Sequence, residues 1–198
     1  METVTVILAG GSSSRMGTDK ALLPVDGRPL LAVQAERWRG VFDALVVSAG
    51  AGGRFAALDL GGARIVEDLR PGAGPLAGLE AAMTAVPAGH YFLTAVDLPF
   101  GEPALARALR ERTGGADVCL IRRADGRPEP LFAVYSRRCL PAVSAALDRG
   151  ERSVVRGLLP YVRTHEIAEE DLPGLHPGRS LYNANTPEDW RRAMEAGG

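Results

Sequence analysis

The residues with the clearest chemical potential lie in a loop that follows an apolar N-terminal segment. Residues 3–9 are mostly apolar and β-branched, and the loop after them contains Gly10, Gly11, Arg15 and Lys20. Glycine lets the backbone approach an anion closely, while arginine and lysine supply charge that meets phosphate. A buried strand that ends in an N–H-rich, positively charged loop therefore predicts a phosphate-binding site. The alternative interpretation is a glycine-serine turn whose two cations are only solvated.

The spacing of this loop differs from two common nucleotide-binding motifs. The Walker A motif places four residues between its glycines and follows them at once with Lys and Ser or Thr. Here five residues separate Gly11 from Gly17, and Lys20 is followed by Ala21. The dinucleotide fingerprint G-x-G-x-x-G is also absent from the loop. The loop is therefore neither a P-loop nor a Rossmann dinucleotide loop.

Two aspartates follow apolar segments at points where a ligand is expected. Asp97 ends the run 91–96, and a carboxylate there suits Mg²⁺, which takes one or two carboxylates together with phosphates and water. A buried Asp without a cation would be costly, although Asp97 could instead cap the next helix. Asp68 follows the segment 64–67 and could accept hydrogen bonds from a ribose or a base, or it could brace the loop that contains Arg70.

Gly78, Asn183 and Asn185 each have two explanations. The two asparagines flank Ala184 in an extended segment, and alternation places both side chains on one side. They could line an acceptor site or complete a metal shell, or they could satisfy the backbone of a turn. Gly78 lies inside a predicted helix at a cost of about 1 kcal/mol relative to Ala. Either a tight helix–strand contact or an approaching ligand could explain that glycine.

The elements that would position these residues alternate between strands and helices. Helical periodicity and proline or capping signals predict helices that start at Pro29, Pro75 and Pro103, further helices at 139–147 and 154–158, and a closing helix after Thr186. Apolar runs predict strands at 3–9, 44–48, 64–67, 91–96, 118–121, 131–135 and 162–167.

This order of elements predicts an α/β fold of three layers, with a Rossmann-like, mainly parallel sheet and helices on both faces. Ligands of such sheets bind beyond the carboxyl ends of the strands. The loop 10–20, Ser48, Asp68 and Asp97 all follow predicted strands, so the sequence predicts one shared site at that edge. Residues 122–130 and 168–180 are predicted as loops.

Composition limits the classes of function. The chain has 198 residues, 46% of them hydrophobic, and this length predicts one domain over residues 1–198. A net charge of −1 argues against general affinity for nucleic acid, which needs a basic excess. Cys119 and Cys139 lie outside any C-x-x-C pair and are predicted as reduced, structural thiols. Without a signal peptide or an apolar run long enough to span a membrane, the chain is expected to be cytoplasmic.

The motifs together resemble those of a known family. From Leu8 to Lys20 the chain spells L-A-G-G-x-S-x-R-M-G-x-D-K, which is similar to nucleotidyltransferases that load a nucleoside monophosphate onto a phosphorylated acceptor. Three further stretches, 74–78, 97–99 and 183–188, follow in the order seen in molybdenum cofactor guanylyltransferases. The combination of the loop with Asn-Ala-Asn-Thr-Pro-Glu near the end of the chain is what indicates the guanylyl member of the group.

The resemblance implies a Mg²⁺-dependent transfer of GMP from GTP to molybdopterin, with release of pyrophosphate. It implies a nucleotide-binding half over residues 1–100 and an acceptor-binding half over residues 101–198. Among partners it implies no nucleic acid and no membrane, and it allows transient contacts with other cofactor-biosynthesis proteins or molybdoenzymes. The implied site residues are, for the nucleotide, Leu8, Ala9, Gly10, Gly11, Lys20, Asp68 and Asp97; for catalysis, Arg15, Lys20 and Asp97; for Mg²⁺, Asp97; and for the acceptor, Asn183 and Asn185.

Two positions depart from the family pattern. Ser48 stands where the family often has Asn, which leaves the guanosine contact at that position open. The step Val96-Asp97-Leu98-Pro99 keeps the carboxylate and changes its neighbours. Two other functions therefore stay open: a cytidylyltransferase or sugar-phosphate nucleotidyltransferase with the same loop, and a nucleotide- or cofactor-binding module without turnover.

Overall fold

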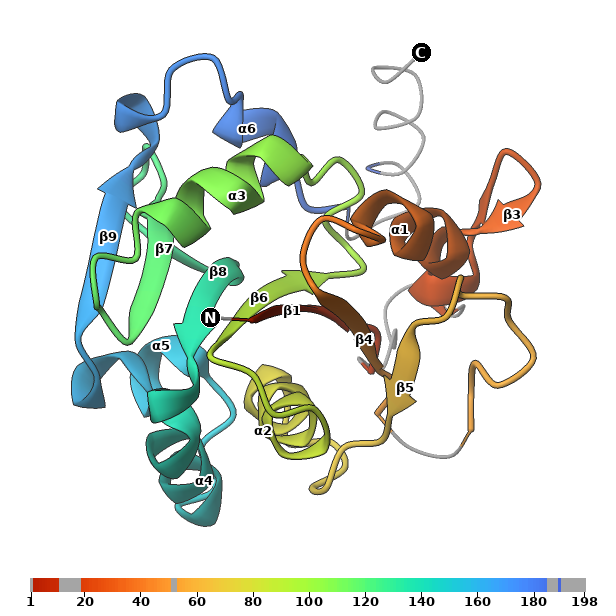
Figure 1. Cartoon of the computed structure of the whole chain (residues 1–198), viewed down its shortest axis with the longest axis horizontal. Coiled ribbons are helices and arrows are strands. Elements are labelled where there is room, and N and C mark those ends of the chain that lie inside the picture. The colour runs from red at the N-terminus through yellow and green to blue at the C-terminus, as the bar shows by residue number, and fades with distance from the viewer. Residues whose placement is uncertain (1, 11–18, 51–52, 185–188, 190–198) are drawn as a thin grey trace.

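A seven-stranded sheet runs through the middle of the protein (Figure 1). The computed structural model describes residues 2–10, 19–50, 53–184 and 189. Strand β8 pairs antiparallel with both of its neighbours, and the other hydrogen-bonded pairs of this sheet are parallel, which confirms the predicted mainly parallel α/β fold. Across the sheet the strands are β5 (Arg64–Val66), β4 (Ala44–Ser48), β1 (Thr3–Leu8), β6 (His90–Ala95), β8 (Pro128–Ser136), β7 (Val118–Arg122) and β9 (Thr164–Ala168).

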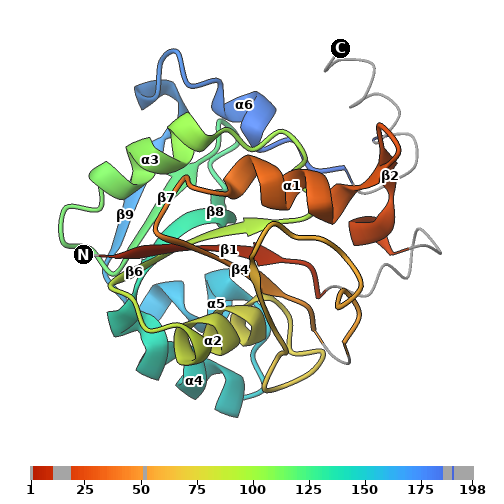
Figure 2. The same cartoon turned by 45° about the vertical axis from the view of Figure 1, so that its right-hand side comes forward.

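Helices cover both faces of this sheet, as Figures 1 and 2 show. Side chains of successive strand residues pack into two apolar cores on opposite faces of the sheet. Ile7 and Phe92 belong to one core, and Val6 and Leu93 belong to the other. This alternation follows from the period of two along a strand and produces the three predicted layers. One face carries α1 (Leu30–Trp38), α3 (Pro103–Glu111) and α6 (Pro177–Ser180), and the other carries α2 (Pro75–Ala85), α4 (Leu140–Asp148) and α5 (Val154–Gly157).

Strand β1 lies at the point where the winding of the sheet reverses. The chain passes from β1 through α1 to β4 on one side, and later through α2 to β6 on the other side. In open parallel sheets such a reversal leaves a crevice outside the carboxyl ends of the two neighbouring strands, because the connections that leave β1 and β6 run toward opposite edges of the sheet. The fold therefore prepares a ligand site beyond Leu8 and Ala95.

Several boundaries differ from the predicted ones. After the loop, the 3₁₀ helix η1 (Lys20–Leu22) and a hairpin of β2 (Pro24–Val25) and β3 (Arg28–Pro29) around Asp26-Gly27 come before α1. Strand β8 starts at Pro128, because its polar first residues pair with β7 after a register shift. The predicted loop 168–180 contains η4 (Glu169–Asp171) and α6, and the predicted closing helix after Thr186 lies outside the described residues.

The two cysteines are free and buried, as predicted. Burial raises the pKa of Cys119 to about 11 and that of Cys139 to about 12. Both thiols therefore stay protonated at neutral pH and act as small apolar side chains.

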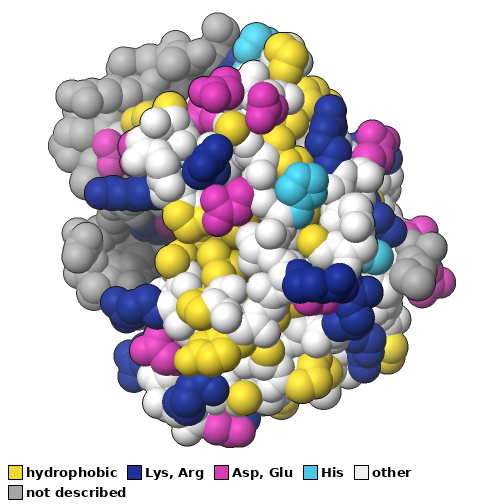
Figure 3. All heavy atoms as spheres, turned by 90° about the vertical axis from the view of Figure 1, so that its left-hand side faces the viewer, with side chains coloured by type: hydrophobic (Ala, Val, Ile, Leu, Met, Phe, Trp, Pro, Cys, Tyr) yellow, Lys and Arg dark blue, Asp and Glu magenta, His cyan; other side chains and the backbone are white. Residues whose placement is uncertain are grey.

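The surface has the mixed character expected of a nearly neutral chain. On the face shown in Figure 3, lysine and arginine side chains are interspersed with acidic and apolar ones. Within the part of the chain that the structure describes, no helix has the length and apolar character needed to cross a membrane.

An aromatic cluster fixes the segment that follows β6. The rings of Trp38, Phe92 and Phe132 lie in mutual contact, with centroid separations of 5.0, 6.0 and 4.9 Å. Gly101, at the end of the turn 97–101, packs directly on this cluster. A Cβ at that position would lie 2.8 Å from the Trp38 ring and 3.0 Å from the Phe132 ring. The cluster thus anchors α1, β8 and the turn that begins at Asp97.

We predict that Gly101→Ala destabilises the protein by about 1–3 kcal/mol, because a methyl group inserted against two buried rings overpacks the core. Ala104→Ser, which also adds one heavy atom but at an exposed position of α3, is the matched control and should change the free energy of unfolding by less than about 0.5 kcal/mol. Urea unfolding of both variants measures this. Equal stability of Gly101→Ala and the wild type would contradict the described packing.

Candidate active site

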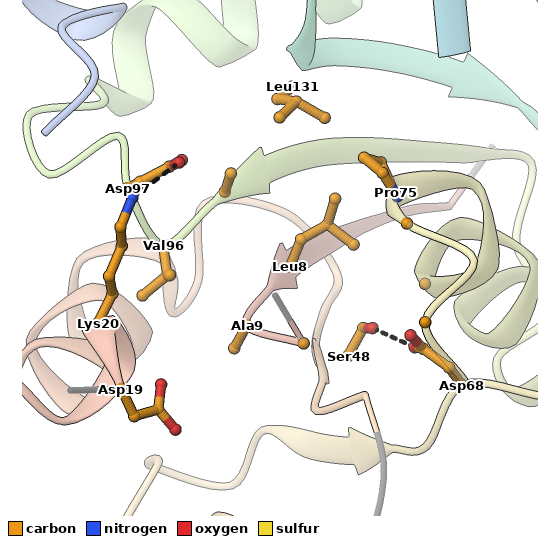
Figure 4. A pocket seen from close by; sticks show the side chains of 15 residues that line it. Leu8, Ala9, Asp19, Lys20, Ser48, Asp68, Pro75, Val96, Asp97 and Leu131 are labelled. Carbon is orange, nitrogen blue, oxygen red and sulfur yellow. Dashed lines mark hydrogen bonds and ion pairs between the residues drawn. The ribbon is translucent and has the colours of Figure 1, made fainter. Parts of the chain in front are cut away.

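A cavity of about 270 Å³ opens at the carboxyl ends of β1, β4 and β6, beside the start of α2 (Figure 4). Leu8, Ala9, Val96 and Leu131 give it an apolar surface, and the polar side chains gather at two ends. Its lining residues are Leu8, Ala9, Gly10, Asp19, Lys20, Ser48, Asp68, Gly72, Gly74, Pro75, Gly78, Ala95, Val96, Asp97 and Leu131.

Lys20 and Asp97 form one polar end of the cavity. The Lys20 Nζ lies 3.6 Å from the Asp97 Oδ2, and their side chains are 17% and 21% exposed. The other carboxylate oxygen, Oδ1, is buried and accepts no hydrogen bond among the described residues. Because a buried oxygen without a donor is costly, this atom is prepared to receive a cation or a donor from a ligand.

The turn that carries Asp97 is held in place from three sides. The Val96 N–H donates to the Leu8 carbonyl at 3.1 Å, which continues the β1–β6 ladder beyond the last strand residues. From α1, the Gln34 Nε2 donates to the Val96 carbonyl at 2.9 Å, and Gln34 is almost fully buried. The Ala184 N–H donates to the Asp97 carbonyl at 3.0 Å. Asp97 is therefore presented by a rigid backbone.

Ser48 and Asp68 form the opposite polar end. The Ser48 Oγ donates to the Asp68 Oδ1 at 2.7 Å, and Figure 4 shows this pair separated from Lys20 and Asp97 by Leu8 and Ala9. Burial raises the pKa of Asp68 above the usual aspartate value, although the hydrogen bond from Ser48 opposes that shift. A partly desolvated carboxylate gains from a ligand that donates hydrogen bonds to it.

Two glycines let the strands and α2 close around the cavity. A Cβ on Gly10 would lie 2.8 Å from the Gly50 backbone, so the chains that leave β1 and β4 can approach only without a side chain there. A Cβ on Gly78 would lie 2.5 Å from the Leu8 side chain and 2.6 Å from the Ser48 Oγ. The tight helix–strand contact is thus the explanation of Gly78 that the structure supports.

Arg54 connects Lys20 to the end of β4 through Asp19. Asp19 caps η1, with its Oδ1 accepting from the Ala21 N–H at 3.1 Å. The Arg54 guanidinium binds the Asp19 carboxylate, donates to the Ala49 carbonyl at 3.1 Å, and lies 4.9 Å from the centre of the Phe55 ring. This bridge fixes the first turn that carries Lys20 relative to the sheet edge.

The structure brings together most of the predicted site residues that it describes. Leu8, Ala9, Gly10, Lys20, Asp68 and Asp97 all line the cavity. Asn183 is exposed and is not among the lining residues, although its neighbour Ala184 binds the Asp97 backbone. The predicted residues Gly11, Arg15 and Asn185 lie outside the described residues.

The sequence pattern does not identify Gln34, Arg54 or Leu131 as contributors to this region. Gln34 carries a weak signal, because a polar residue on the buried face of a helix usually has a buried partner. Arg54 and Leu131 carry none, since their roles depend on which distant segments meet them.

The sequence is similar to a known protein family and to several of its members. A family model described as the MobA-like NTP transferase domain matches residues 5–172. A probable molybdenum cofactor guanylyltransferase of Pelotomaculum thermopropionicum is 37% identical over 194 residues, covering 98% of this chain and 92% of that protein. A molybdenum cofactor guanylyltransferase of Desulfosudis oleivorans is 33% identical over 205 residues, covering 99% and 96%.

Solved structures agree as well. The molybdopterin-guanine dinucleotide biosynthesis protein A of Archaeoglobus fulgidus matches with a TM-score of 0.86 at 25% identity, over 98% of both chains. A CMP:2-keto-3-deoxy-manno-octonic acid synthetase complexed with CTP matches with a TM-score of 0.72 at 16% identity, which shows a common fold. Because the family model spans most of the chain and the relatives cover nearly all of it, this protein belongs to the MobA-like NTP transferase family.

Proposed function

We propose that the protein transfers GMP from GTP to molybdopterin, forming the guanine dinucleotide cofactor and releasing pyrophosphate. The observation that carries this proposal is a single cavity with a cation–carboxylate pair at one end and a hydrogen-bonding carboxylate at the other. The first end suits a triphosphate and the second suits a base or ribose. The names of the guanylyltransferase relatives support guanine as the base and molybdopterin as the acceptor.

In the proposed reaction, an oxygen of the acceptor's terminal phosphate attacks the α-phosphorus of GTP. A new P–O bond forms there while the bond between the α-phosphorus and the oxygen bridging to the β-phosphate breaks, and pyrophosphate leaves with that electron pair. The nucleophile is already an anion, so the protein needs neither a general base nor a covalent intermediate. Lys20 binds the phosphates and Arg15 is proposed to assist it, which places charge where it develops in the transition state.

The residues of the cavity fit a Mg²⁺ ion. Asp97 offers a buried carboxylate oxygen that has no hydrogen-bond donor among the described residues. In the same part of the chain no group of three or more His, Cys, Asp or Glu gathers to bind a metal, which agrees with an ion that takes one or two carboxylates and completes its shell with phosphate and water. We propose that Asp97 holds Mg²⁺, which when bound would neutralise phosphate charge. Asn183 and Asn185 are proposed to face the acceptor.

The two halves of the chain have different roles in this proposal. Residues 1–100 supply the polar residues of the cavity and bind the nucleotide, and residues 101–198 bind the acceptor. Leu131 of β8, from the second half, lines the same cavity as Leu8 from the first, which supports a site shared by both. Gly11, by its position next to Gly10, is proposed to contact the phosphates with its N–H group.

A nucleotide panel tests the reaction and the base. With molybdopterin as acceptor and Mg²⁺ present, we expect pyrophosphate release with GTP to exceed that with CTP, ATP or UTP. CTP as the best substrate would indicate a cytidylyltransferase. GTP binding in calorimetry without pyrophosphate release would indicate a binding module, and omission of the acceptor provides the background rate.

Replacement of the proposed metal ligand tests the catalytic end. We predict that Asp97→Asn lowers kcat by about 10²–10³ or more while the fold is retained, because the proposed Mg²⁺ loses its carboxylate ligand and the phosphate charge is no longer neutralised. The exposed Asp171→Asn in η4 is the matched control and should keep the wild-type rate. Chelation of divalent ions should abolish activity, and added Mg²⁺ should restore it. A fully active Asp97→Asn enzyme would refute the assignment.

The pH dependence of GTP binding tests the other end. Because the pKa of Asp68 is raised by burial, its carboxylate takes up a proton at a higher pH than an exposed aspartate does as the pH falls. Affinity for GTP should therefore be full above that pKa and fall as pH drops through it. Asp68→Asn should bind GTP about tenfold more weakly at neutral pH, roughly the value of one hydrogen bond to a charged group. Its affinity should also no longer fall as the pH drops through the pKa of Asp68.

The control for this experiment is Glu67→Gln, the exposed neighbour whose carboxylate accepts from the Gly53 N–H at 3.0 Å. It should keep both the affinity and the pH profile of the wild type. If Asp68→Asn and the wild type bind GTP with the same affinity at every pH of the acid range, Asp68 does not contact the base.

A further inference from the structure

A second carboxylate lies beside Asp97 at the end of the sheet. Strands β6 and β8 pair antiparallel from His90 opposite Ser136 to Thr94 opposite Phe132. Glu129 lies beyond these pairs, past a register shift at which the pairing of β8 with β7 passes from Ala133 to Glu129. Burial raises the pKa of Glu129, and the nearby charge of Asp97 adds to that rise, so the two carboxylates lie near enough to interact. Neither residue periodicity nor the loop motif predicts this juxtaposition.

Arg123 neutralises Glu129 and reaches a third segment. Its Nη2 lies 2.9 Å from the Glu129 Oε2, and the two side chains are 31% and 15% exposed. The same guanidinium donates to the Leu181 carbonyl. The other oxygen of Glu129 accepts from the Leu131 N–H at 3.1 Å. The ion pair thus joins the β7–β8 connection, the start of β8 and the segment 181–184.

The segment around 181–184 is in turn built onto the Asp97 turn. The Ala184 N–H donates to the Asp97 carbonyl at 3.0 Å, and Leu181 and Ala184 are buried. The Tyr182 ring lies 6.3 Å from that of Phe100, measured between centroids. Consequently the Asp97 turn is bound by a segment that is more than eighty residues away in sequence and is held at one end by Arg123.

We propose that Arg123 and Glu129 are positioning residues for the acceptor. Their ion pair holds segment 181–184 against the Asp97 turn, and in this proposal the acceptor's phosphate passes along that segment to reach the nucleotide. We call the Arg123–Glu129 ion pair, with its contact to segment 181–184, the clamp. The identity of the acceptor rests on the proposed function, whereas the clamp follows from the contacts alone. An arginine suits this role because its planar fork can serve a carboxylate and a carbonyl at once, which a lysine cannot do in the same geometry.

The variants Arg123→Met, Glu129→Gln and their double combination test the clamp. The matched control is Arg127→Met with Asp125→Asn, a pair in the same loop whose Nε–Oδ2 distance is 3.9 Å and whose side chains are 83% and 55% exposed. Three quantities are measured for each protein: amide hydrogen exchange in 181–184 without ligand, the Kd of GTP by calorimetry, and kcat and KM for molybdopterin.

We expect the Ala184 amide to exchange about tenfold faster in both single variants, because local opening no longer breaks the Arg123 contacts. The acceptor KM should rise on the order of tenfold because segment 181–184 is misplaced, while the Kd of GTP changes less than about twofold. Because the two residues act as one unit, the double variant should be no worse than the poorer single variant. Arg127→Met with Asp125→Asn should match the wild type throughout.

Wild-type exchange and acceptor KM in Arg123→Met would overturn the proposal. So would a loss of GTP affinity as large as the rise in acceptor KM, because the pair would then support the whole sheet edge rather than the acceptor side. If Arg123→Met does not fold, Arg123→Lys, which keeps the charge without the fork, should show an intermediate rise in exchange. If the wild type binds GTP but makes no product, the proposed function fails, and the exchange data still decide whether the clamp exists.

Discussion

The parallel pairing of β1 with β4 on one side and with β6 on the other is the constraint on which the site depends. The Ala9 N–H donates to the Ser48 carbonyl at 2.9 Å, and the Val96 N–H donates to the Leu8 carbonyl at 3.1 Å. These two bonds carry the ladder past the last strand residues and determine how three chain segments leave the sheet together. Glycine at position 10 is the steric condition for this convergence, because the Gly50 backbone occupies the space of a side chain.

The electrostatics of the cavity follow from this backbone arrangement. The polar side chains lie at separate strand ends, so Lys20 and Asp97 are kept apart from Ser48 and Asp68 by the apolar residues of β1. A ligand that is anionic at one end and rich in hydrogen-bond donors at the other matches this separation, and a nucleoside triphosphate has that form. Apolar walls also lower the local dielectric, which strengthens the interaction of each polar end with its part of the ligand.

The sequence predicts the part of this site that depends on local pattern. Strand β1, the glycines after it and the aspartates after β5 and β6 can be predicted, because apolar runs mark the strands and parallel topology brings their carboxyl ends to one edge. The supporting residues depend on distant partners. Gln34 and the Val96 carbonyl are 62 residues apart, and Glu129 comes near Asp97 only because the polar start of β8, which resembles a loop, joins the sheet after a register shift. Arg15, Gly11 and Asn185 remain predictions from the motif.

The proposed function requires the triphosphate to lie beyond β1, with its phosphates between Gly10, Lys20 and Asp97 and its base beside Asp68. A crystal structure of the protein with GTP and Mg²⁺ tests this most directly. We predict that the Lys20 Nζ lies within hydrogen-bond distance of a phosphate oxygen, that the Asp97 carboxylate binds the metal, and that donors of the guanosine bind the Asp68 carboxylate. A nucleotide bound with the reverse orientation, or outside this cavity, would contradict it.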